Sequence, residues 1–453
     1  MKVDIVIVGA GPGGADAALL LAKAGKKVVL VEKDEIGGEC LNWGCVPTKA
    51  LVHAAEILDI TKESKRFGIE ISDAKADWQA VLAYKNRICT MLRMGLTKSL
   101  EAAGVEIVKG FGKLKDKNTV LIEPSLSNEA ARSLEADYII LAAGSAPFVI
   151  PSITLSERIV TSRNIYDWPE LPKSILIVGG GVIGLEFASF LNAFGVAVTI
   201  VEMLPRIANT EDEDVSAELT RIMERRGVKI LTSTKLAALT EDEKGLNAKF
   251  ENEAGLTEAT FEKALICIGR RPAFSQMGLA EIGITVEKGV KVNAKLQTSI
   301  PNIYAIGDLT GESILAYISS AHGKIAAHEI LGKEKKYNLE VFPRCIFTNP
   351  EIASCGLTEK QLTEKGIEYE VKKAMYAANG KASIHGKRDG FLKLLIEKST
   401  DKILGAAIIG DSANLMIDKA VLAIAQGMTA GQLEEILAGH PVLSELYTAA
   451  LES

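Results

Sequence analysis

Short runs of apolar, mostly β-branched residues recur along the 453-residue chain and predict its fold. The first run, residues 4–8, leads into a glycine-rich turn. Helix-like spacing over 15–24 and a second apolar run over 27–31 follow. Apolar runs bounded by glycine are typical of buried parallel strands. The amino-terminal segment is therefore predicted to fold as strand, helix and strand.

The same arrangement recurs in the middle of the chain. An apolar run at 175–178 precedes the glycine-rich stretch 179–184, and another run follows at 198–201. The whole segment is apolar enough to suggest a membrane span. Glu186, Asn192 and three consecutive glycines interrupt it, so we expect a second strand–loop–helix–strand unit instead.

Further patterns predict the rest of the architecture. Additional strands are expected at 107–111, 137–142, 264–268 and 303–306. Pro147 and Pro151 mark a domain boundary. From about residue 337 the chain shows alternating stretches such as 391–396, and then helices. The sequence thus predicts an α/β protein with two Rossmann-like dinucleotide-binding domains and a C-terminal α+β domain.

Both glycine-rich turns have the spacing of a dinucleotide-binding loop. Their glycines are Gly9, Gly11 and Gly14 in the first turn and Gly179, Gly181 and Gly184 in the second. The first glycine of each set makes the turn, the second lets the backbone approach a pyrophosphate, and the third lets helix and strand pack closely. Two dinucleotide sites are predicted.

An acid ends the second strand of each unit, Glu32 in the first and Glu202 in the second. Such a carboxylate accepts hydrogen bonds from ribose hydroxyls and repels a 2′-phosphate. Met203 and Leu204, which follow Glu202, offer no cation, and Arg206 is the nearest one. The second site is therefore expected to prefer NAD over NADP.

Charge and cysteine content narrow the class of protein. A net charge of −6 gives no reason to expect nucleic acid or an anionic membrane as a partner. No export leader precedes the first strand, and the six cysteines lack the periodic spacing of a secreted disulfide framework. We therefore expect a cytoplasmic protein.

Two cysteines five residues apart, Cys40 and Cys45, are the first candidates for chemistry. Pro47 can open a helix, which would place Cys45 at the positive end of its dipole, with Lys49 on the same face. Both effects favour the thiolate. Because a bond between these cysteines would close a very short loop, a redox couple is more reasonable than a structural cross-link.

A histidine near the carboxyl terminus is the leading candidate for a base. His440 is followed by proline and, five residues on, by Glu445, whose carboxylate could orient the ring and raise its basicity. Without the rest of the sequence, such a histidine and glutamate would more often be exposed surface residues with no catalytic role. The histidines His53, His322, His328 and His385 are interpreted as helix or loop residues without an acidic or cysteine partner.

Together these segments resemble the flavoprotein disulfide reductases, most of all the members that oxidise dihydrolipoyl groups. The resemblance covers essentially the whole chain. Its motifs, in order, are the first glycine loop, Gly-Gly-Glu-Cys-Leu-Asn-Trp-Gly-Cys-Val-Pro-Thr-Lys, Ala-Ala-Gly-Ser, Gly-Gly-Gly-Val-Ile-Gly-Leu-Glu, Cys-Ile-Gly-Arg-Arg-Pro, Tyr-Ala-Ile-Gly-Asp and His-Pro-Val-Leu-Ser-Glu.

The resemblance implies where the two cofactors bind and that no metal is needed. FAD would be bound tightly but non-covalently by Gly9, Gly11, Gly14, Glu32, Lys33, Lys49, Gly112, Ala143, Gly144, Ser145, Asp308, Ile314, Leu315, Ala316 and Tyr317. NAD would be bound by Gly179, Gly181, Val182, Ile183, Gly184, Glu186, Glu202 and Gly269. Read on its own, Asp308 at the end of a strand is more readily a turn or capping residue.

The resemblance also implies the domain boundaries. The FAD-binding domain would occupy 1–147 and resume in a central region, 270–338. The NAD-binding domain would occupy 148–269, and 339–453 would form the interface of a homodimer.

The implied activity is oxidation of a protein-bound dihydrolipoyl dithiol with reduction of NAD⁺. Cys40 would exchange with substrate, Cys45 would face the flavin, and Lys49 and Glu186 would pair beside the flavin N5. His440, which would be joined to Pro441 by a cis peptide bond, would act as a base on the dithiol of the partner subunit. The lipoyl group would come from a protein of a 2-oxoacid dehydrogenase complex or the glycine cleavage system.

Two alternatives remain open at this point. One is an NADH-dependent reductase of another small disulfide, and the other is a flavin-bearing redox-sensing or assembly subunit. The chain departs from the family pattern, which usually has Thr at Ala143, His at Tyr317 and Ala438, Thr at Val442 and an acid near Leu415. Because the last three positions are expected near the substrate entrance, the identity of the substrate is the open question.

Overall fold

The computed structural model describes residues 2–124 and 131–453. The chain forms two compact units, each assembled from three separate stretches. Unit 1 comprises Met1–Ala50, Ala80–Phe148 and Gly269–Tyr337, and unit 2 comprises Leu51–Gln79, Val149–Ile268 and Asn338–Ser453. Among the described residues, no helix has the length and apolar character needed to cross a membrane.

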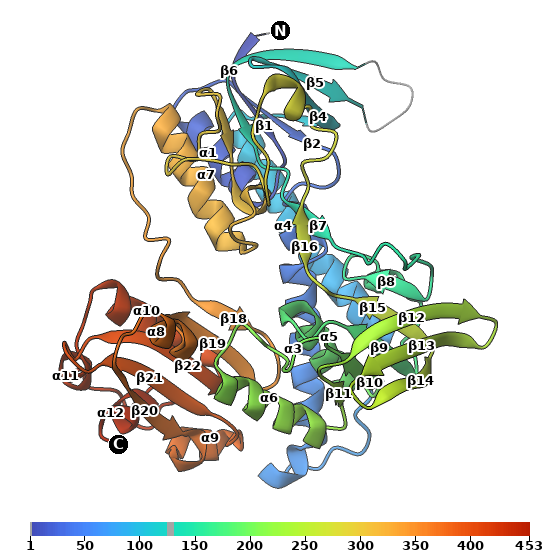
Figure 1. The fold of residues 1–453 in the computed structure, drawn as a ribbon, viewed down its shortest axis with the longest axis vertical. Coiled ribbons are helices and arrows are strands. Elements are labelled where there is room, and N and C mark those ends of the chain that lie inside the picture. Colours follow the sequence, from blue (N-terminus) through green and yellow to red (C-terminus); the bar gives the residue numbers. More distant parts are fainter. Residues whose placement is uncertain (1, 125–130) are drawn as a thin grey trace. The chain divides into compact units, whose positions relative to one another are not determined.

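Unit 1 is built on a seven-stranded sheet with strand order β3-β2-β1-β6-β5-β4, and β17 also pairs with β6 (Figure 1). The strands are β1 (Lys2–Val8), β2 (Val28–Glu32), β3 (Glu106–Lys109), β4 (Phe111–Asp116), β5 (Thr119–Glu123), β6 (Arg132–Leu141) and β17 (Ile303–Ala305), beside a short antiparallel pair, β7 (Ser145–Pro147) and β16 (Arg270–Pro272). Strands β1, β2, β3, β6 and β17 run parallel. The buried parallel strands expected from the apolar runs are confirmed.

One expected strand is divided in two. The pattern predicted a single strand over 107–111, whereas β3 ends at Lys109 and β4 begins at Phe111. Gly110 separates them with a φ of 154° and donates its N–H to the carbonyl of Glu32. Glycine adopts this conformation without strain, so the chain turns here from the parallel part of the sheet into its antiparallel part.

Helix α1 (Pro12–Lys23) of unit 1 packs on β1 and β2 of this sheet. The other helical elements of the unit are α2 (Gly38–Asn42), the first turn of α3 (Cys45–Lys62), most of α4 (Trp78–Ala102), α7 (Ala316–Ile330) and the short 3₁₀ helices η3 (Ala280–Ile282) and η4 (Gly307–Thr310). Helices α1 and α7 lie side by side (Figure 1). An added Cβ at Gly323 would lie 2.1 Å from the carbonyl oxygen of Gly13, so glycine permits this close helix contact.

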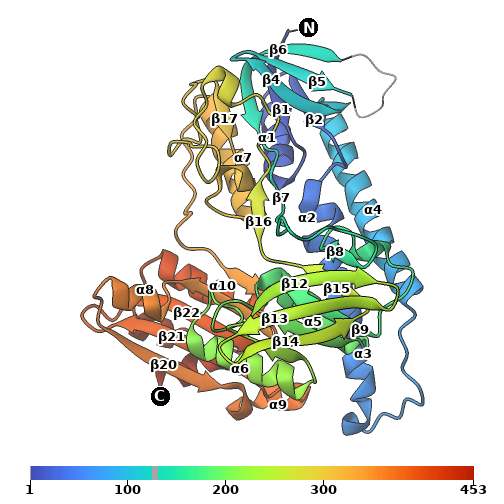
Figure 2. The ribbon, with the colours of Figure 1, turned by 45° about the vertical axis from the view of Figure 1, so that its right-hand side comes forward.

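Unit 2 contains the second strand–helix–strand unit. Its five-stranded parallel sheet has the order β11-β10-β9-β15-β8, and a three-stranded antiparallel sheet, β12-β13-β14, follows β11 in the chain (Figure 2). These elements are β8 (Ile159–Thr161), η2 (Ile165–Asp167), β9 (Ser174–Val178), α5 (Val182–Ala193), β10 (Ala197–Val201), α6 (Glu213–Arg225), β11 (Lys229–Leu231), β12 (Lys235–Asp242), β13 (Gly245–Asn252), β14 (Gly255–Phe261) and β15 (Lys263–Ile266). The apolar segment 175–201 is thus strand, loop, helix and strand, as expected.

The C-terminal part of unit 2 is an antiparallel sheet with the order β18-β19-β22-β21-β20, covered by helices. Helix α10 packs on β19 and β22, and α12 packs on β20 and β21. The elements are β18 (Arg344–Ile346), β19 (Glu351–Gly356), α8 (Glu359–Glu364), β20 (Tyr369–Met375), η5 (Tyr376–Ala378), α9 (Gly380–His385), β21 (Phe391–Glu397), β22 (Ile403–Gly410), α10 (Ala413–Ala425), α11 (Ala430–Glu434) and α12 (Glu445–Leu451); η1 (Ser64–Phe67) follows α3. The predicted α+β tail is confirmed.

A buried lysine joins the two parts of unit 2. Lys393 on β21 is fully buried, and its Nζ lies 2.6 Å from Asp214 and Glu359 and 2.8 Å from Asp212. Three carboxylates compensate for burial of the ammonium group, which would otherwise cost several kcal/mol. They also raise the pKa of Lys393 against the opposing effect of burial. The lysine therefore fixes the start of α6 to the C-terminal sheet.

Candidate functional site

The two cysteines of the predicted redox couple form a disulfide. Cys40 lies on α2, and Cys45 is the first residue of α3, as the position of Pro47 predicted. The preceding turn uses Gly37 and Gly38, both with positive φ. On reduction, Cys45 would stand at the positive end of a long helix, a position that favours the thiolate over the thiol. The local fold therefore suits a thiolate that can attack a disulfide.

An arginine ties the dithiol segment to the rest of unit 1. The Arg270 guanidinium lies 3.1 Å from the Glu39 carboxylate, next to Cys40, and donates to the Ser145 hydroxyl at 2.8 Å. That hydroxyl donates in turn to Asp308 at 2.6 Å. The Arg270 side chain is only 9% exposed, which strengthens these contacts. Sequence reasoning included Ser145 and Asp308 but missed Arg270 and Glu39, although both stand inside motifs it used.

Asp308 has a structural role that the capping interpretation did not foresee. Its carboxylate accepts from the hydroxyls of Ser145 and Ser319, at 2.6 and 3.3 Å, and in the described structure no side chain caps η4. An acid held by two hydroxyls at the carboxyl end of β17 lies where ligands bind in open α/β sheets. This placement favours the ligand-binding interpretation.

The first glycine loop fits a dinucleotide. Gly9 has a φ of 107°, and an added Cβ would lie 2.3 Å from the Ala142 carbonyl; at Gly14 it would lie 2.0 Å from the Gly9 carbonyl. At Gly11, which precedes the first turn of α1, an added Cβ would meet no described atom within 4 Å. Free space before a helix N-terminus is what a pyrophosphate needs. The residues present therefore fit the phosphates of FAD.

Glu32 closes the first loop. Its carboxylate accepts from the N–H groups of Ala10 and Asp34, each at 2.7 Å. Burial raises its pKa, while the two N–H groups oppose that shift. The side chain is thus oriented at the end of β2, where a ribose hydroxyl would approach.

The second loop repeats this geometry. Gly179 has a φ of 109°, an added Cβ at Gly184 would lie 2.1 Å from the Gly179 carbonyl, and Gly181 again faces open space in the described structure. Glu202 accepts from Gly180 at 2.7 Å and from Leu204 at 2.8 Å. A second dinucleotide fits here for the same physical reasons.

Arg206, the cation that could favour NADP, is engaged locally. Its guanidinium donates to the backbone carbonyls of Glu211 and Asn209, at 2.6 and 3.2 Å. Met203 next to Glu202 is largely exposed. The surroundings of Glu202 therefore keep the carboxylate as the dominant charge beside the expected ribose.

The remaining predicted cofactor residues lie on loops and helix starts. Gly112 packs on Val8, Gly144 and Gly269 have positive φ and face open space in the described structure, and Val182 and Ile183 begin α5. Ile314 and Tyr317 are exposed and Leu315 precedes α7, which begins at Ala316. Lys33 follows β2 and Ala143 follows β6. Their contacts with cofactors remain predictions.

Lys49 and Glu186 lie on different helices. Lys49 is on the first turns of α3, one turn beyond Cys45, as predicted. Glu186 is buried on α5, and its carboxylate accepts from the Phe347 N–H at 3.0 Å. Sequence reasoning did not anticipate that bond. The pairing of Lys49 with Glu186 remains a prediction.

His440 and Glu445 form a hydrogen-bonded pair, and the role of His440 as a base stays a prediction. Nδ1 of His440 lies 2.9 Å from Oε1 of Glu445, and Oε2 of the same carboxylate accepts from the Val442 N–H at 2.9 Å. The peptide bond to Pro441 is cis, as the resemblance implied. The His440 side chain is 81% exposed. The geometry fixes one ring nitrogen and leaves Nε2 accessible for proton transfer.

Two other histidines have partners that sequence reasoning missed. The interpretation of His385 as lacking an acidic partner was wrong, because its Nδ1 lies 2.6 Å from Asp411. His53 lies 3.8 Å from Glu56, a looser pair. His322 is buried, accepts from the Gly307 N–H at 3.2 Å, and has a pKa lowered by burial. Asp411 and Gly307 lie far from their partners in the sequence, so no local pattern predicts these contacts.

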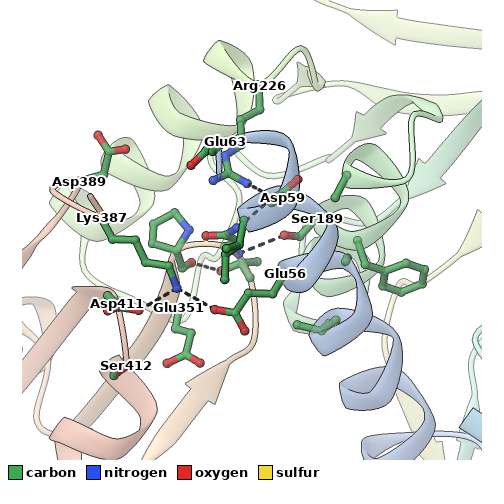
Figure 3. A pocket seen from close by; sticks show the side chains of 18 of the residues that line it. Glu56, Asp59, Glu63, Ser189, Arg226, Glu351, Lys387, Asp389, Asp411 and Ser412 are labelled. Atoms are coloured by element: carbon green, nitrogen blue, oxygen red, sulfur yellow. Dashed lines mark hydrogen bonds and ion pairs between the residues drawn. The ribbon is translucent and has the colours of Figure 1, made fainter. Parts of the chain in front are cut away.

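A polar cavity of about 570 Å³ lies elsewhere in unit 2, lined by α3, the end of α6 and the C-terminal part (Figure 3). Lys387 pairs there with Glu56 and Asp411, and Arg226 pairs with Asp59. Burial raises the pKa of Glu351 to about 7. None of the predicted catalytic or cofactor-binding residues lines this cavity, so it is not the candidate site.

The chain is similar to known proteins over its whole length. It is 36% identical over 448 residues to dihydrolipoyl dehydrogenase of Chlorobaculum tepidum, covering 98% of this chain and 95% of that one. It is 35% identical to the enzymes of that name from Geobacillus stearothermophilus and Bacillus subtilis, covering all of this chain and 96% and 98% of theirs.

Solved structures agree on the fold. LpdA of Mycobacterium tuberculosis has a TM-score of 0.91 at 27% identity, covering 99% of both chains. The HOCl-induced flavoprotein disulfide reductase RclA of Escherichia coli has a TM-score of 0.89 at 27% identity, also covering 99% of both.

Family models match almost all of the chain. The model described as pyridine nucleotide-disulphide oxidoreductase matches residues 3–324, and the dimerisation domain of that family matches 342–451. The disulfide, the two glycine loops and the oriented histidine lie within these matches. The chain belongs to the pyridine nucleotide-disulphide oxidoreductase family.

Proposed function

We propose that this protein oxidises a protein-bound dihydrolipoyl dithiol to the disulfide and reduces NAD⁺ to NADH. The observation that carries the proposal is the Cys40–Cys45 disulfide at the start of α3, in a chain about 35% identical over its full length to proteins named dihydrolipoyl dehydrogenase. Members of this family use FAD and NAD.

The chain's own residues account for the thiol chemistry. A substrate thiolate attacks the sulfur of Cys40 and releases Cys45 as a thiolate. The second substrate thiolate then displaces Cys40, so the substrate disulfide forms as the protein disulfide breaks. The two substrate thiols lose two protons. His440 accepts one at Nε2 while Glu445 stabilises the cationic ring, and the displaced Cys40 thiolate takes up the other. FAD, when bound, supplies an acceptor for the electron pair and a hydride donor to the nicotinamide.

The proposed binding roles follow the predicted residues. FAD binds at the loop of Gly9, Gly11 and Gly14, and NAD at the loop of Gly179, Gly181 and Gly184. The FAD domain spans 1–147 and resumes at 270–338, with the NAD domain at 148–269 and the dimer interface in 339–453. The carboxylate of Glu202 accepts hydrogen bonds from the ribose hydroxyls of NAD. The protein acts as a cytoplasmic homodimer, and the lipoyl group arrives on another protein.

A second candidate, an NADH-dependent reductase of another small disulfide, is favoured by the apolar residues near the expected substrate entrance. Leu415 is 75% exposed, and Val442 lies two residues from the base. The similarity to a flavoprotein disulfide reductase from Escherichia coli points the same way.

A steady-state comparison separates these candidates. The purified holoenzyme is assayed with dihydrolipoamide, glutathione disulfide and Hg(II), each with NAD(H) and with NADP(H). The proposal predicts rapid turnover of dihydrolipoamide with NAD⁺ alone. Faster turnover of another disulfide with NADH supports the second candidate, and turnover at background with every substrate supports a redox-sensing or assembly subunit.

A further inference from the structure

An asparagine between the two cysteines of the redox couple holds the turn that precedes them. Asn42 is buried on α2, and its Nδ2 donates to the backbone carbonyls of Ile36 and Gly38, at 3.0 and 2.9 Å. Gly37 and Gly38 both have positive φ in this turn. The amide of Asn42 therefore bridges the two sides of the turn that leads into Cys40.

Arg93 of α4 determines which way this amide faces. Its Nη1 donates to Oδ1 of Asn42 at 2.9 Å, and its Nε lies 3.5 Å from the Glu35 carboxylate. The amide group has two N–H donors on one atom and an acceptor on the other, so its two ends are not interchangeable. If the amide were turned over, its oxygen would face two carbonyl oxygens. The guanidinium thus stabilises the one orientation that holds the turn.

Helix α2 depends on such side-chain contacts because it is very short. It has five residues, and an isolated helix of that length is unstable in water. Asn42 is only 8% exposed, so water has little access to its oxygen. A buried amide oxygen that loses its donor is costly. Removing the guanidinium of Arg93 would therefore loosen the turn and α2 together.

The disulfide and the reduced dithiol depend on this contact to different extents. In the oxidised protein, the bond between Cys40 and Cys45 closes the loop covalently. After reduction, hydrogen bonds and packing alone keep the two sulfur atoms near each other. A reduced loop that opens lowers the effective molarity of one thiol toward the other and disfavours re-formation of the disulfide. The contact between Arg93 and Asn42 therefore matters most in the reduced state.

We propose that Arg93 is a positioning residue for the redox couple. Through Asn42 it keeps Cys40 and Cys45 together after the disulfide is reduced, and so maintains the equilibrium between disulfide and dithiol. Its action passes through the amide and needs no contact with either sulfur atom. This inference rests on the redox role that the proposed function gives to the two cysteines, and it adds a residue from a separate helix to that role.

Exchange with dithiothreitol tests the proposal. One dithiothreitol gives up two electrons and two protons and becomes a cyclic disulfide, while the protein disulfide becomes two thiols. The holoenzyme is equilibrated without oxygen in mixtures of reduced and oxidised dithiothreitol, and the thiols of Cys40 and Cys45 are counted by alkylation and mass spectrometry. In Arg93→Met the equilibrium constant for reduction should rise about tenfold, because the reduced loop opens.

Two further variants of α4 serve as references. Arg93→Lys keeps a long side chain with a donor and should restore most of the native equilibrium constant. Arg87→Met changes an exposed arginine on the same helix, whose guanidinium lies 5.7 Å from the centre of the Tyr84 ring, and should leave the constant unchanged. An equal rise in Arg87→Met would overturn the proposal.

The sign of the effect separates positioning from a direct effect of charge. Removing a positive charge near a thiolate disfavours the reduced form and would lower the equilibrium constant for reduction. A lower constant in Arg93→Met, or an unchanged one, overturns the positioning role. A rise that persists at high ionic strength supports it, because salt screens charges and has little effect on the geometry of a loop.

A double-mutant cycle shows whether the effect passes through Asn42. In an Asn42→Ala background, Arg93→Met should have no further effect, and an undiminished effect would contradict the proposal. If Asn42→Ala does not fold, amide hydrogen exchange over residues 36–44 decides. Exchange should be faster in reduced Arg93→Met than in the reduced native protein, and equal in the two oxidised proteins. Equal exchange in both redox states would overturn the proposal.

Failure of the proposed function is distinguishable from failure of this inference, because the dithiothreitol equilibrium requires no turnover. If the native protein does not oxidise dihydrolipoamide but Arg93→Met shifts the equilibrium, the proposed function is wrong and the positioning role stands. If dihydrolipoamide is oxidised and the equilibrium does not shift, the proposed function stands and the positioning role is wrong.

Discussion

The two glycine loops share one backbone geometry but differ in what surrounds them. In unit 1, an added Cβ at Gly13 would lie 2.5 Å from the Ser319 carbonyl of α7, and one at Gly38 would lie 2.8 Å from Gly11. In unit 2, Gly181 faces open space in the described structure. The first loop is enclosed by the dithiol segment and by α7. This enclosure suits a cofactor that stays bound, whereas the open loop suits one that is exchanged at every turnover.

Because the two loops differ in enclosure, the largest effect is expected from equivalent substitutions at Gly11 and Gly181. Gly11→Val and Gly181→Val both place a side chain where a pyrophosphate would lie, and in the described structure the added Cβ of each has no neighbour within 4 Å. Gly11→Val should fold but lose the yellow flavin. Gly181→Val should keep its flavin and raise the KM for NAD at least about tenfold, a loss of about 1.4 kcal/mol. Absorbance at the flavin band and NAD kinetics measure the two outcomes. Flavin loss in both variants would contradict the assignment of FAD to the first loop and NAD to the second.

The carboxylate of the second unit should control cofactor choice. The double variant Glu202→Ala, Met203→Arg removes a repulsive charge and adds an attractive one beside the 2′-phosphate. We expect the NADP/NAD ratio of kcat/KM to rise on the order of 100-fold, or about 2.7 kcal/mol. Glu202→Gln, which keeps the shape, should give a smaller rise. If the NADP/NAD ratio of kcat/KM is unchanged in the double variant, Glu202 does not contact the ribose.

The enclosure of the first unit should depend on Arg270. Arg270→Met removes the contacts that the guanidinium makes with Glu39 and Ser145, at a cost of about 2 kcal/mol. Thermal unfolding, followed by flavin release, should occur several degrees lower than in the native protein. Arg271→Met changes the neighbouring, exposed arginine and serves as the control. Equal melting temperatures for the two variants would show that the buried contacts of Arg270 add nothing.

The smallest expected effect is a pH dependence confined to unit 1. Burial lowers the pKa of His322, so the unfolded chain binds a proton more readily than the folded one. The contribution of His322 to stability should therefore fall as the pH drops through about 6.5, by at most about 1.4 kcal/mol per pH unit. His322→Gln keeps an acceptor for Gly307 and should flatten this dependence in denaturation between pH 5 and 7. An unchanged slope of stability against pH in this variant would show that His322 is not the origin of the pH dependence.

The repeated units were predictable because their determinants are local. Apolar runs, glycine spacing and a terminal acid fall within a few tens of residues, so β1, α1 and β2 and their counterparts β9, α5 and β10 follow from the sequence. The cysteine pair and the His440–Glu445 pair are equally local. Their geometry follows from short-range rules for helix starts and turns.

Contacts between distant residues were not predictable in this way. Arg270 and Glu39 are 231 positions apart, and His385 at the end of α9 meets Asp411, which follows β22, 26 positions away. Lys393 stands in an apolar strand, and nothing near it in the sequence indicates three carboxylates. Such partners become visible only when the chain is folded. They are also the contacts that hold separate segments together.

Subunit mixing tests most directly whether the dithiol and the base form one site in a dimer. Cys45→Ser and His440→Gln chains, each inactive toward dihydrolipoamide, are unfolded and refolded together in equal amounts. Random pairing makes about half of the dimers mixed, and each mixed dimer has one site with an intact dithiol and an intact partner histidine. The account predicts recovery of about a quarter of native activity. If mass spectrometry confirms mixed dimers and activity stays at background, the claim that the dithiol of one subunit and the histidine of its partner form one site is wrong.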